Sequence, residues 1–249
     1  MIAPVTLALL ALTVLATSFL SGIFGMAGGI ILLGVLLLVL DVAQAMVLFG
    51  STQMAANGWR ATLWRAHVHW RLVAGYCAGA LLAFLLMRLI AYVPGKAFMY
   101  LALGTMPFIA DVLPKSLEPD ITRPGMPVAC GAILTVCNLM AGATGTLLDV
   151  FFQKSALDRK SIVATKAVTQ SFAHLLRIFY FGSLSSAFEV VIPWWVYAAA
   201  IVPAVLGTTL AARVLEAMTD ADFRRWSRRI IMAVSLTFIA RGAWLLLTG

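Results

Sequence analysis

Long apolar segments separated by short polar connections run through this chain from one end to the other. Several approach or exceed the ~20 residues that a helix needs to cross the ~30 Å hydrocarbon core of a bilayer. They lack the alternation of membrane β-strands, and 62% of the residues are hydrophobic while 11% are charged. Because helices and closed barrels satisfy every backbone polar group in lipid, the sequence predicts an all-α, multi-pass membrane protein.

Two of the apolar segments are too short to span the bilayer at about 1.5 Å per residue, namely 30–40 and 146–152. Each follows a glycine-rich break, Gly25-Met26-Ala27-Gly28-Gly29 in the first half and Gly142-Ala143-Thr144-Gly145-Thr146 in the second. A broken, re-entrant helix hairpin is therefore expected at both places. All expected helical segments are 3–24, 30–40, 43–64, 72–93, 97–112, 126–142, 146–152, 161–182, 192–215 and 230–248.

An internal repeat relates the two halves of the chain. A shift of 117 residues pairs Gly25 with Gly142 and Gly28 with Gly145 without a gap. The same register gives the further pairs Leu40/Leu157, Asp41/Asp158, Thr52/Thr169, Gln53/Gln170, Ala56/Ala173 and Arg60/Arg177. We predict a first repeat over 1–112 (hairpin 3–40, helices 43–64, 72–93, 97–112), a cytoplasmic linker over 113–125, and a second repeat over 126–249 (hairpin 126–157, helices 161–182, 192–215, 230–248).

The distribution of lysine and arginine indicates that the two repeats have opposite orientations. Short cytoplasmic loops carry an excess of these residues. The connection after 43–64 contains Arg60, Arg65 and Arg71, whereas the equivalent connection near 183–192 contains no basic residue. The basic connections assigned to the cytoplasm are 58–71, 113–125, 154–160 and 224–229. This assignment predicts inverted repeats in the cell (inner) membrane, with the N-terminus and the C-terminus both outside.

The two glycine breaks are the first candidate site. Irregular backbone at membrane depth is tolerated where it is buried in protein or lines an aqueous cavity, so the breaks should meet between the halves. The helix N-termini that follow them offer free N–H groups, which bind anions. The alternative is that these glycines only permit close helix packing. The candidate substrate-binding residues here are Gly25, Gly28, Gly29, Gly142, Thr144, Gly145 and Thr146.

A polar stripe along 161–182 is the second candidate. Lys166, Gln170, His174 and Arg177 follow at helical spacing and share one face. Charged side chains inside a membrane helix are costly unless they face a cavity or a partner. The first-half equivalents are Phe49, Gln53, Asn57 and Arg60.

We expect this stripe to attract and bind an anion; the alternative is snorkelling of long side chains at helix ends. Further candidate substrate-binding residues are Thr52, Gln53, Asn57, Thr169, Gln170 and His174. Arg60 and Arg177 would guard the two mouths, with Lys166 adding to the anion attraction.

Asp149 stands in the short segment 146–152 and has two interpretations. It pairs with Lys166, or it exchanges protons during transport, alone or with His174, whose unperturbed pKa of ~6.5 suits that role. No set of metal ligands or cofactor motif is visible, and none is expected. Cys77, Cys130 and Cys137 lie in apolar segments without a Cys-x-x-Cys pattern and are predicted to be small buried hydrophobic residues.

The segment Ser21-Gly22-Ile23-Phe24-Gly25-Met26-Ala27-Gly28-Gly29-Ile30-Ile31-Leu32 resembles the glycine-rich first-helix signature of the TauE/SafE sulfite exporter family, also called the 4-toluene sulfonate uptake permease family. The duplication, the size and the absence of soluble domains match over essentially the whole chain. The resemblance implies a multi-pass carrier of sulfite, sulfonates or related sulfur-containing anions. The second half departs from the pattern, because its glycine cluster is reduced and Asp149 replaces an apolar residue.

The sequence therefore predicts a secondary transporter, with export the expected direction, of small sulfur oxyanions by alternating access around a midplane site. An anion channel and a carrier of another organic anion, such as a carboxylate, remain alternatives. We do not expect an enzyme, because no nucleophile with a nearby base is visible. The expected partners are the anion, the lipid bilayer, a coupling proton or sodium ion, and a second copy in a homodimer; no nucleic-acid partner is expected.

Overall fold

The computed structural model of the chain describes residues 4–24, 27–112, 119–184, 192–217 and 220–248. Within these ranges the protein is all-α, with ten α-helices and one short 3-10 turn, η1 (Arg65–His67). The helices are α1 (Pro4–Phe24), α2 (Ala27–Val39), α3 (Val42–Leu63), α4 (Trp70–Ile90), α5 (Lys96–Val112), α6 (Met126–Ala141), α7 (Gly145–Gln153), α8 (Arg159–Gly182), α9 (Trp194–Ala217) and α10 (Asp220–Thr248).

Each expected apolar segment forms a helix, and one of them is much longer than expected. Helix α10 begins at Asp220, ten residues before the predicted start at 230. The basic run that was expected to be a connection, 224–229, is instead part of the first turns of this 29-residue helix. Arginine favours helix almost as well as leucine, so this polar segment continues the apolar helix that follows it.

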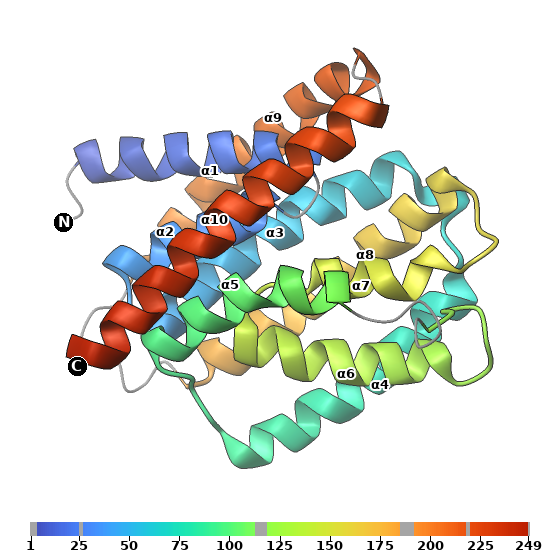
Figure 1. Cartoon of the computed structure of the whole chain (residues 1–249), viewed down its shortest axis with the longest axis horizontal. Coiled ribbons are helices and arrows are strands. Elements are labelled where there is room, and N and C mark those ends of the chain that lie inside the picture. Colours follow the sequence, from blue (N-terminus) through green and yellow to red (C-terminus); the bar gives the residue numbers. More distant parts are fainter. Residues whose placement is uncertain (1–3, 25–26, 113–118, 185–191, 218–219, 249) are drawn as a thin grey trace.

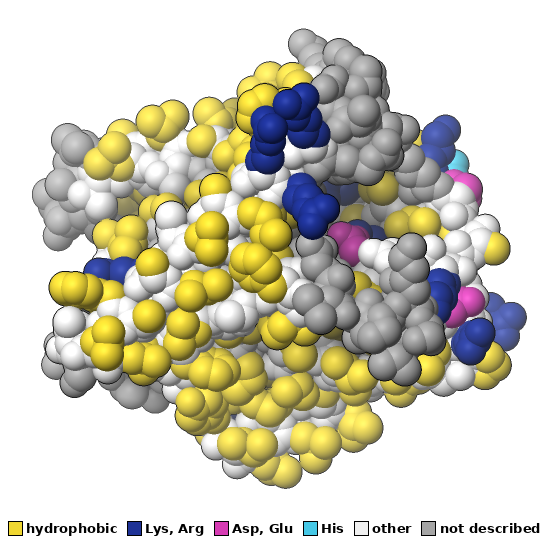
Figure 2. All heavy atoms as spheres, in the orientation of Figure 1, with side chains coloured by type: hydrophobic (Ala, Val, Ile, Leu, Met, Phe, Trp, Pro, Cys, Tyr) yellow, Lys and Arg dark blue, Asp and Glu magenta, His cyan; other side chains and the backbone are white. Residues whose placement is uncertain are grey.

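The outer surface of the molecule is apolar. Side chains that a soluble protein would bury are open, such as Leu89 (83% exposed) and Leu247 (85% exposed). Hydrophobic atoms cover most of the face shown in Figure 2. Among the described residues, four helices are long and apolar enough to cross a membrane, over Thr6–Phe24, Trp70–Ile90, Trp194–Ala211 and Arg228–Thr248. The chain is a polytopic membrane protein, and these exposed side chains face lipid.

Two polar helices, α3 and α8, pack against each other in the centre of the bundle (Figure 1). They carry many of the buried polar side chains, among them Gln53, Asn57, His174 and Arg177. Both helices are as long as a span but contain too few apolar residues to face lipid. The apolar helices around them therefore provide the surface that contacts the membrane, and the polar pair provides the interior.

Two tight helix crossings hold the outer helices together, α1 against α9 and α4 against α6. A Cβ on Gly79 of α4 would overlap the carbonyl oxygen of Val128 on α6. A Cβ on Gly207 of α9 would lie 2.5 Å from the carbonyl oxygen of Leu15 on α1. Only glycine permits such an approach of two backbones, and in both crossings the two helices run parallel.

The breaks leave the second helix of each hairpin short. Helix α2 has 13 residues and α7 has nine, which corresponds to about 20 and 14 Å of rise. The break before α7 turns at Gly142, whose φ of 81° is one that residues with a side chain rarely adopt. Neither short helix is long enough to cross a bilayer.

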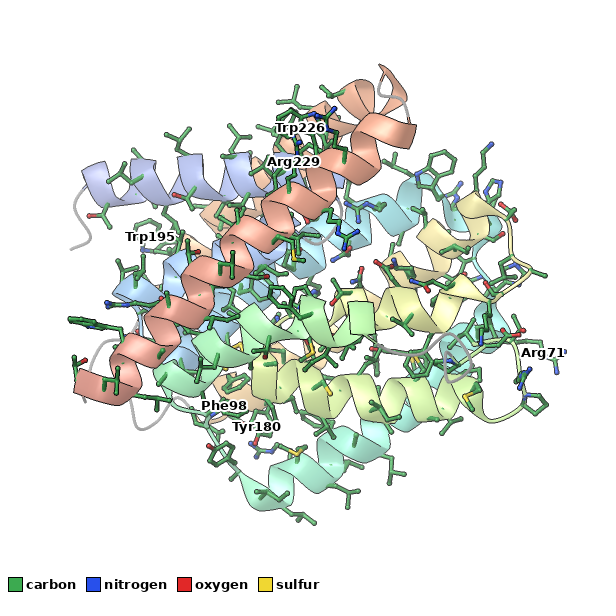
Figure 3. The ribbon with its side chains drawn as sticks, viewed as in Figure 1. Arg71, Phe98, Tyr180, Trp195, Trp226 and Arg229 are labelled. Atoms are coloured by element: carbon green, nitrogen blue, oxygen red, sulfur yellow. The ribbon has the colours of Figure 1, made fainter. Side chains whose placement is uncertain are left out.

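The two ends of the bundle differ in which side chains they carry. The start of α1 and the end of α10 lie at the same end of the molecule (Figure 1). Trp195 and Phe98 are labelled towards that end, and Arg71 lies at the opposite end (Figure 3). Long helices run between these ends, so the two ends correspond to the two faces of the membrane.

Candidate functional site

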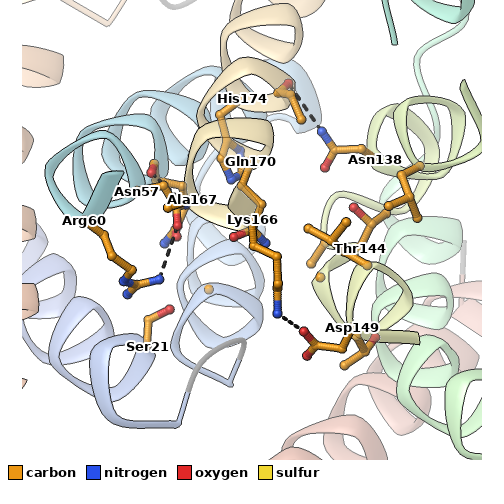
Figure 4. A pocket seen from close by; sticks show the side chains of 18 of the residues that line it. Ser21, Asn57, Arg60, Asn138, Thr144, Asp149, Lys166, Ala167, Gln170 and His174 are labelled. Atoms are coloured by element: carbon orange, nitrogen blue, oxygen red, sulfur yellow. Dashed lines mark hydrogen bonds and ion pairs between the residues drawn. The ribbon is translucent and has the colours of Figure 1, made fainter. Parts of the chain in front are cut away.

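A cavity of about 480 Å³ lies between the two hairpin breaks and the central helices α3 and α8. Figure 4 shows it from close by. Its lining combines polar and apolar side chains and comes from both halves of the chain. The polar residues that line it are Ser21, Gln53, Asn57, Arg60, Tyr76, Asn138, Thr144, Thr146, Asp149, Lys166, Gln170 and His174. A partly polar cavity inside a lipid-embedded bundle is a place where a polar solute can be held.

The first hairpin contributes the start of α2. Gly29 lines the cavity, and a Cβ built on it would lie 3.7 Å from Nε2 of Gln53. Gly28 lies behind it, where a Cβ would overlap the carbonyl oxygen of Thr17 on α1, so this glycine serves helix packing. Gly25 is outside the described residues. The predicted contribution of the first break is therefore placed at Gly29.

The second hairpin contributes the start of α7. Thr144 is the N-cap residue, but its side chain makes no capping hydrogen bond, and Gly145 and Thr146 follow it along the cavity wall. Gly142 is buried and does not line the cavity; a Cβ there would overlap Leu33. The first N–H groups of a helix have no intrahelical partner, so this end of α7 offers donors to the cavity.

Arg177 is placed differently from the prediction. It was expected to guard an outer mouth, but it is 0% exposed and is not among the residues that line the cavity. Its guanidinium donates to the carbonyl oxygens of Asn138 and Gly142 and to the side-chain oxygen of Asn138. The guanidinium carbon also lies 4.8 Å from the ring centroid of Phe49.

These bonds give Arg177 a structural task at the second hairpin. The carbonyl groups in the last turn of a helix have no intrahelical partner and carry partial negative charge. Arg177 satisfies the carbonyl of Gly142 in this way and adds a second donor to the carbonyl of Asn138, which already accepts the N–H of Gly142, and so fixes the hairpin tip from behind the cavity wall. A planar fork of donors suits this task better than an ammonium group does.

His174 lines the cavity and contacts the same arginine. The Nη1 atom of Arg177 lies 3.2 Å from Nδ1 of His174. A guanidinium has only donors, so Nδ1 accepts and the ring proton belongs on Nε2. A second ring proton would place a donor against a donor. This contact favours a neutral ring that donates from Nε2, and it disfavours His174 as a proton carrier.

Lys166 and Asp149 form an ion pair across the cavity, between α8 and α7 (Figure 4). The side chains are 20% and 44% exposed, so both remain accessible. Of the two interpretations of Asp149 that the sequence left open, the structure contains the ion pair, and proton exchange stays a prediction.

Two residues of the first half at the cavity wall have hydrogen-bonding capacity left. Arg60 donates to Oδ1 of Asn57 over 3.3 Å and points towards Ser21 (Figure 4). Gln53 is 6% exposed, and its Nε2 atom has no hydrogen-bond partner within the described part of the chain. A buried amide donor without a partner costs about 1–3 kcal/mol, a cost that a bound acceptor would remove.

Thr52 and Thr169 do not line the cavity, although both were predicted to bind substrate. Each is buried and donates to a carbonyl of its own helix, Phe49 in one case and Lys166 in the other. Their neighbours Gln53 and Gln170 do line it. A helix turns about 100° per residue, which is why adjacent residues differ in this way.

Three polar lining residues were not predicted, namely Ser21, Tyr76 and Asn138. Ser21 and Asn138 could have been found, because the 117-residue shift pairs them and both interrupt an apolar segment. Tyr76 has no comparable signal in the sequence. Among the described residues, no group of three or more His, Cys, Asp or Glu side chains could hold a metal ion.

The fold and the cavity define a polytopic membrane protein of the transporter class. The family model described as sulfite exporter TauE/SafE matches residues 9–238, so the chain belongs to that family. The family comprises membrane transporters rather than enzymes, and it implies an anionic substrate. Searches of curated proteins and of solved structures found no match.

Proposed function

We propose that the protein is a secondary transporter that exports a small sulfur oxyanion, such as sulfite or an organosulfonate, from the cell. The observation that carries this proposal is the cavity itself, where Arg60, Lys166 and the unpartnered Nε2 of Gln53 meet the starts of two broken helices. Oxyanions accept hydrogen bonds from such donors. The family description favours sulfite and the export direction.

The anion would rest between the two tips, with donors from each half. The N–H groups at the starts of α2 and α7, the amides of Gln53 and Gln170, and Nε2 of His174 surround this place. Arg60 supplies the attracting charge at the side of Ser21. Most of these donors are uncharged, which lets the site release the anion after binding it.

Inverted repeats are part of the proposal, and the helix packing supports them. The register relates α1 to α6 and α4 to α9, and these helices form the crossings α1 with α9 and α4 with α6. Helices α3 and α8 are equivalents that pack on each other, as are α5 and α10. This is the pattern expected from two halves related by a twofold axis in the membrane plane.

Alternating access would exchange the roles of Arg60 and Arg177, which are equivalent in the repeat. Arg177 holds the end of α6 closed, whereas Arg60 stands in the open cavity beside Ser21, the counterpart of Asn138. In the opposite state, we expect Arg60 to bind the carbonyl end of α1 and Arg177 to release α6. Each arginine would then close one side in turn.

The proposed orientation places Arg71 in the cytoplasm and both termini outside. Arg60 and Lys166 line the cavity near the end of α3 and the start of α8, on the side that we assign to the cytoplasm, so the structure would represent the inward-open state. Coupling to protons would act through Asp149, the acidic residue that lines the cavity among those described. Sodium coupling is the alternative. Reporter fusions at positions 66 and 185 test the orientation, which is wrong if both lie on one side.

A thermal-stability screen of the purified protein tests the proposed function. Sulfite, methanesulfonate and ethanesulfonate are expected to raise the Tm, whereas acetate and succinate are not, because a ligand stabilises the state that it binds. If no anion changes the Tm, the proposal fails. A carrier and a channel with the same cavity are separated in proteoliposomes, where flux that saturates and responds to a proton gradient indicates the carrier.

A further inference from the structure

The charged side chains that line the cavity do not make it strongly basic, because most of their charges cancel. Four ionisable side chains other than Tyr76 line it among the described residues, namely Arg60, Lys166, Asp149 and His174. Lys166 and Asp149 neutralise each other, and the contact with Arg177 favours a neutral His174. Arg177 itself points away from the cavity onto the carbonyl end of α6. One positive charge, on Arg60, remains for a ligand.

The first half of the chain shows that this fold does not require the ion pair. In the register of the repeat, Asp149 corresponds to Leu32 and Lys166 to Phe49. Both are buried apolar residues, at 0% and 2% exposure. An ion pair that leaves water loses hydration, and well-packed apolar residues are often as stable or more so. The fold therefore does not explain why the second half carries Asp149 and Lys166 at these positions.

We propose that Asp149 limits the cavity to singly charged anions, such as organosulfonates and hydrogensulfite. Its carboxylate is 44% exposed, so a ligand near Lys166 experiences its negative charge as well as the positive charge of the lysine. A monoanion balances Arg60 and leaves the cavity neutral. A dianion adds a second negative charge that no cation of the cavity compensates, and it repels Asp149. This inference rests on the proposed function and names the charge of its substrate.

Two ligands of matched chemistry test the inference, ethanesulfonate with one charge and ethane-1,2-disulfonate with two. Their Kd values are measured by isothermal titration on the detergent-solubilised full chain at pH 8. The wild type is expected to bind the monosulfonate more tightly. Asp149→Asn raises the cavity charge by one unit and should shift the affinity ratio towards the disulfonate by about tenfold or more, at an effective dielectric constant of about 20.

A charge-restoring double variant keeps the test independent of folding effects. Asp149→Asn combined with Lys166→Met returns the cavity to one positive charge and should restore the wild-type preference. Asp41→Asn is the control, since it removes the same charge from the exposed N-cap of α3 outside the cavity. A monodisperse elution profile and an unchanged Tm show that each variant is folded.

The outcomes separate the two proposals. An affinity ratio that Asp149→Asn leaves unchanged, or that the double variant does not restore, overturns the role of Asp149 while the anion site stands. If neither sulfonate binds to the wild type or to any variant, the proposed function fails instead. If Asp149→Asn does not fold, the double variant alone decides. In that case the role is overturned when the affinity ratio of the double variant differs from that of the wild type, because loss of Lys166 changes the ratio unless the charge of Asp149 had offset it.

Discussion

The two halves of this molecule use equivalent residues in different ways. Arg177 is enclosed and holds the carbonyl groups at the end of α6, whereas Arg60 stands in the cavity and contacts Asn57. Helices α3 and α8 begin at equivalent aspartates with nearly equal backbone angles, φ −70° and −67°. The two arginines therefore differ in their side-chain partners, although the helices that carry them begin in the same way. Arg177 is bonded behind the cavity wall, and Arg60 lines the cavity.

The largest expected effect concerns the two arginines. Arg177→Ala should lower the free energy of unfolding by about 3 kcal/mol, because hydrogen bonds to a charged group contribute about 1.5–3 kcal/mol each and the carbonyl of Gly142 and the side-chain oxygen of Asn138 lose their charged donor. Arg60→Ala removes one long hydrogen bond at the cavity and should change stability little, while abolishing anion uptake into proteoliposomes. Thermal unfolding in detergent measures the first effect and flux measures the second.

Arg177→Lys completes this pair of variants. A lysine keeps the charge but has no planar fork for both carbonyls and the Asn138 amide, so an intermediate stability is expected. Equal losses of stability for Arg60→Ala and Arg177→Ala would remove the difference between the halves. The proposed exchange of roles between Arg60 and Arg177 during transport would then have no structural basis.

A second variant tests whether Gln53, in the first half of the chain, contributes to anion binding. Gln53→Leu removes a buried amide whose Nε2 has no partner in the described structure, so the Tm should not fall. Anion affinity should drop about tenfold, the value of one hydrogen bond to a charged ligand. Thr52→Val is the matched control, because Thr52 donates within its own helix over 2.9 Å and should leave affinity unchanged. Equal affinities of the two variants would exclude Gln53 from the site.

The smallest expected effect concerns the N-caps of the two central helices. Asp158 accepts hydrogen bonds from Ser161 and Lys160, and these bonds lower the pKa of its carboxyl group, with Ser161 the main cause. Asp41 makes no capping bond. At pH 7, Asp158→Ala should lower the Tm by about 2–4 °C, and Asp41→Ala should not.

The pH dependence of this stabilisation follows from the sign of the shift. A lowered pKa means that the stabilisation is present above the pKa of the unfolded chain, about 4. It is lost as the pH falls through the lower pKa of the folded protein. The Tm values of the wild type and of Asp158→Ala should therefore converge in thermal unfolding curves at acidic pH, below the lowered pKa of this carboxyl group. A gap that persists there would assign the stabilisation to something other than the carboxylate.

The sequence was a good guide to the helices and a weaker guide to the depth of the side chains. Segment lengths and glycine breaks located α2 and α7, since apolar length and backbone breaks are local properties. Periodicity also placed Lys166 and Arg177 on one face of α8. It could not show that the cavity ends between them, because this depends on where the end of α6 covers α8. About 16 Å along the helix axis separates Lys166 from Arg177, so two residues on the same face of α8 do not have to line the same cavity.

The parallel crossings at Gly79 and Gly207 have a consequence for the order in which this membrane protein is assembled. Helix α1 packs along α9, which begins 170 residues after α1 ends, and α4 packs along α6. The first half therefore leaves the ribosome with two of its tightest surfaces uncovered. Lipid must cover the surface of α4 until α6 is made, shortly after the middle of the chain, and the surface of α1 until α9 is made near the end of synthesis. A chain cut in the connection between α5 and α6 should yield two fragments that are stable when they are expressed together and short-lived when either is expressed alone.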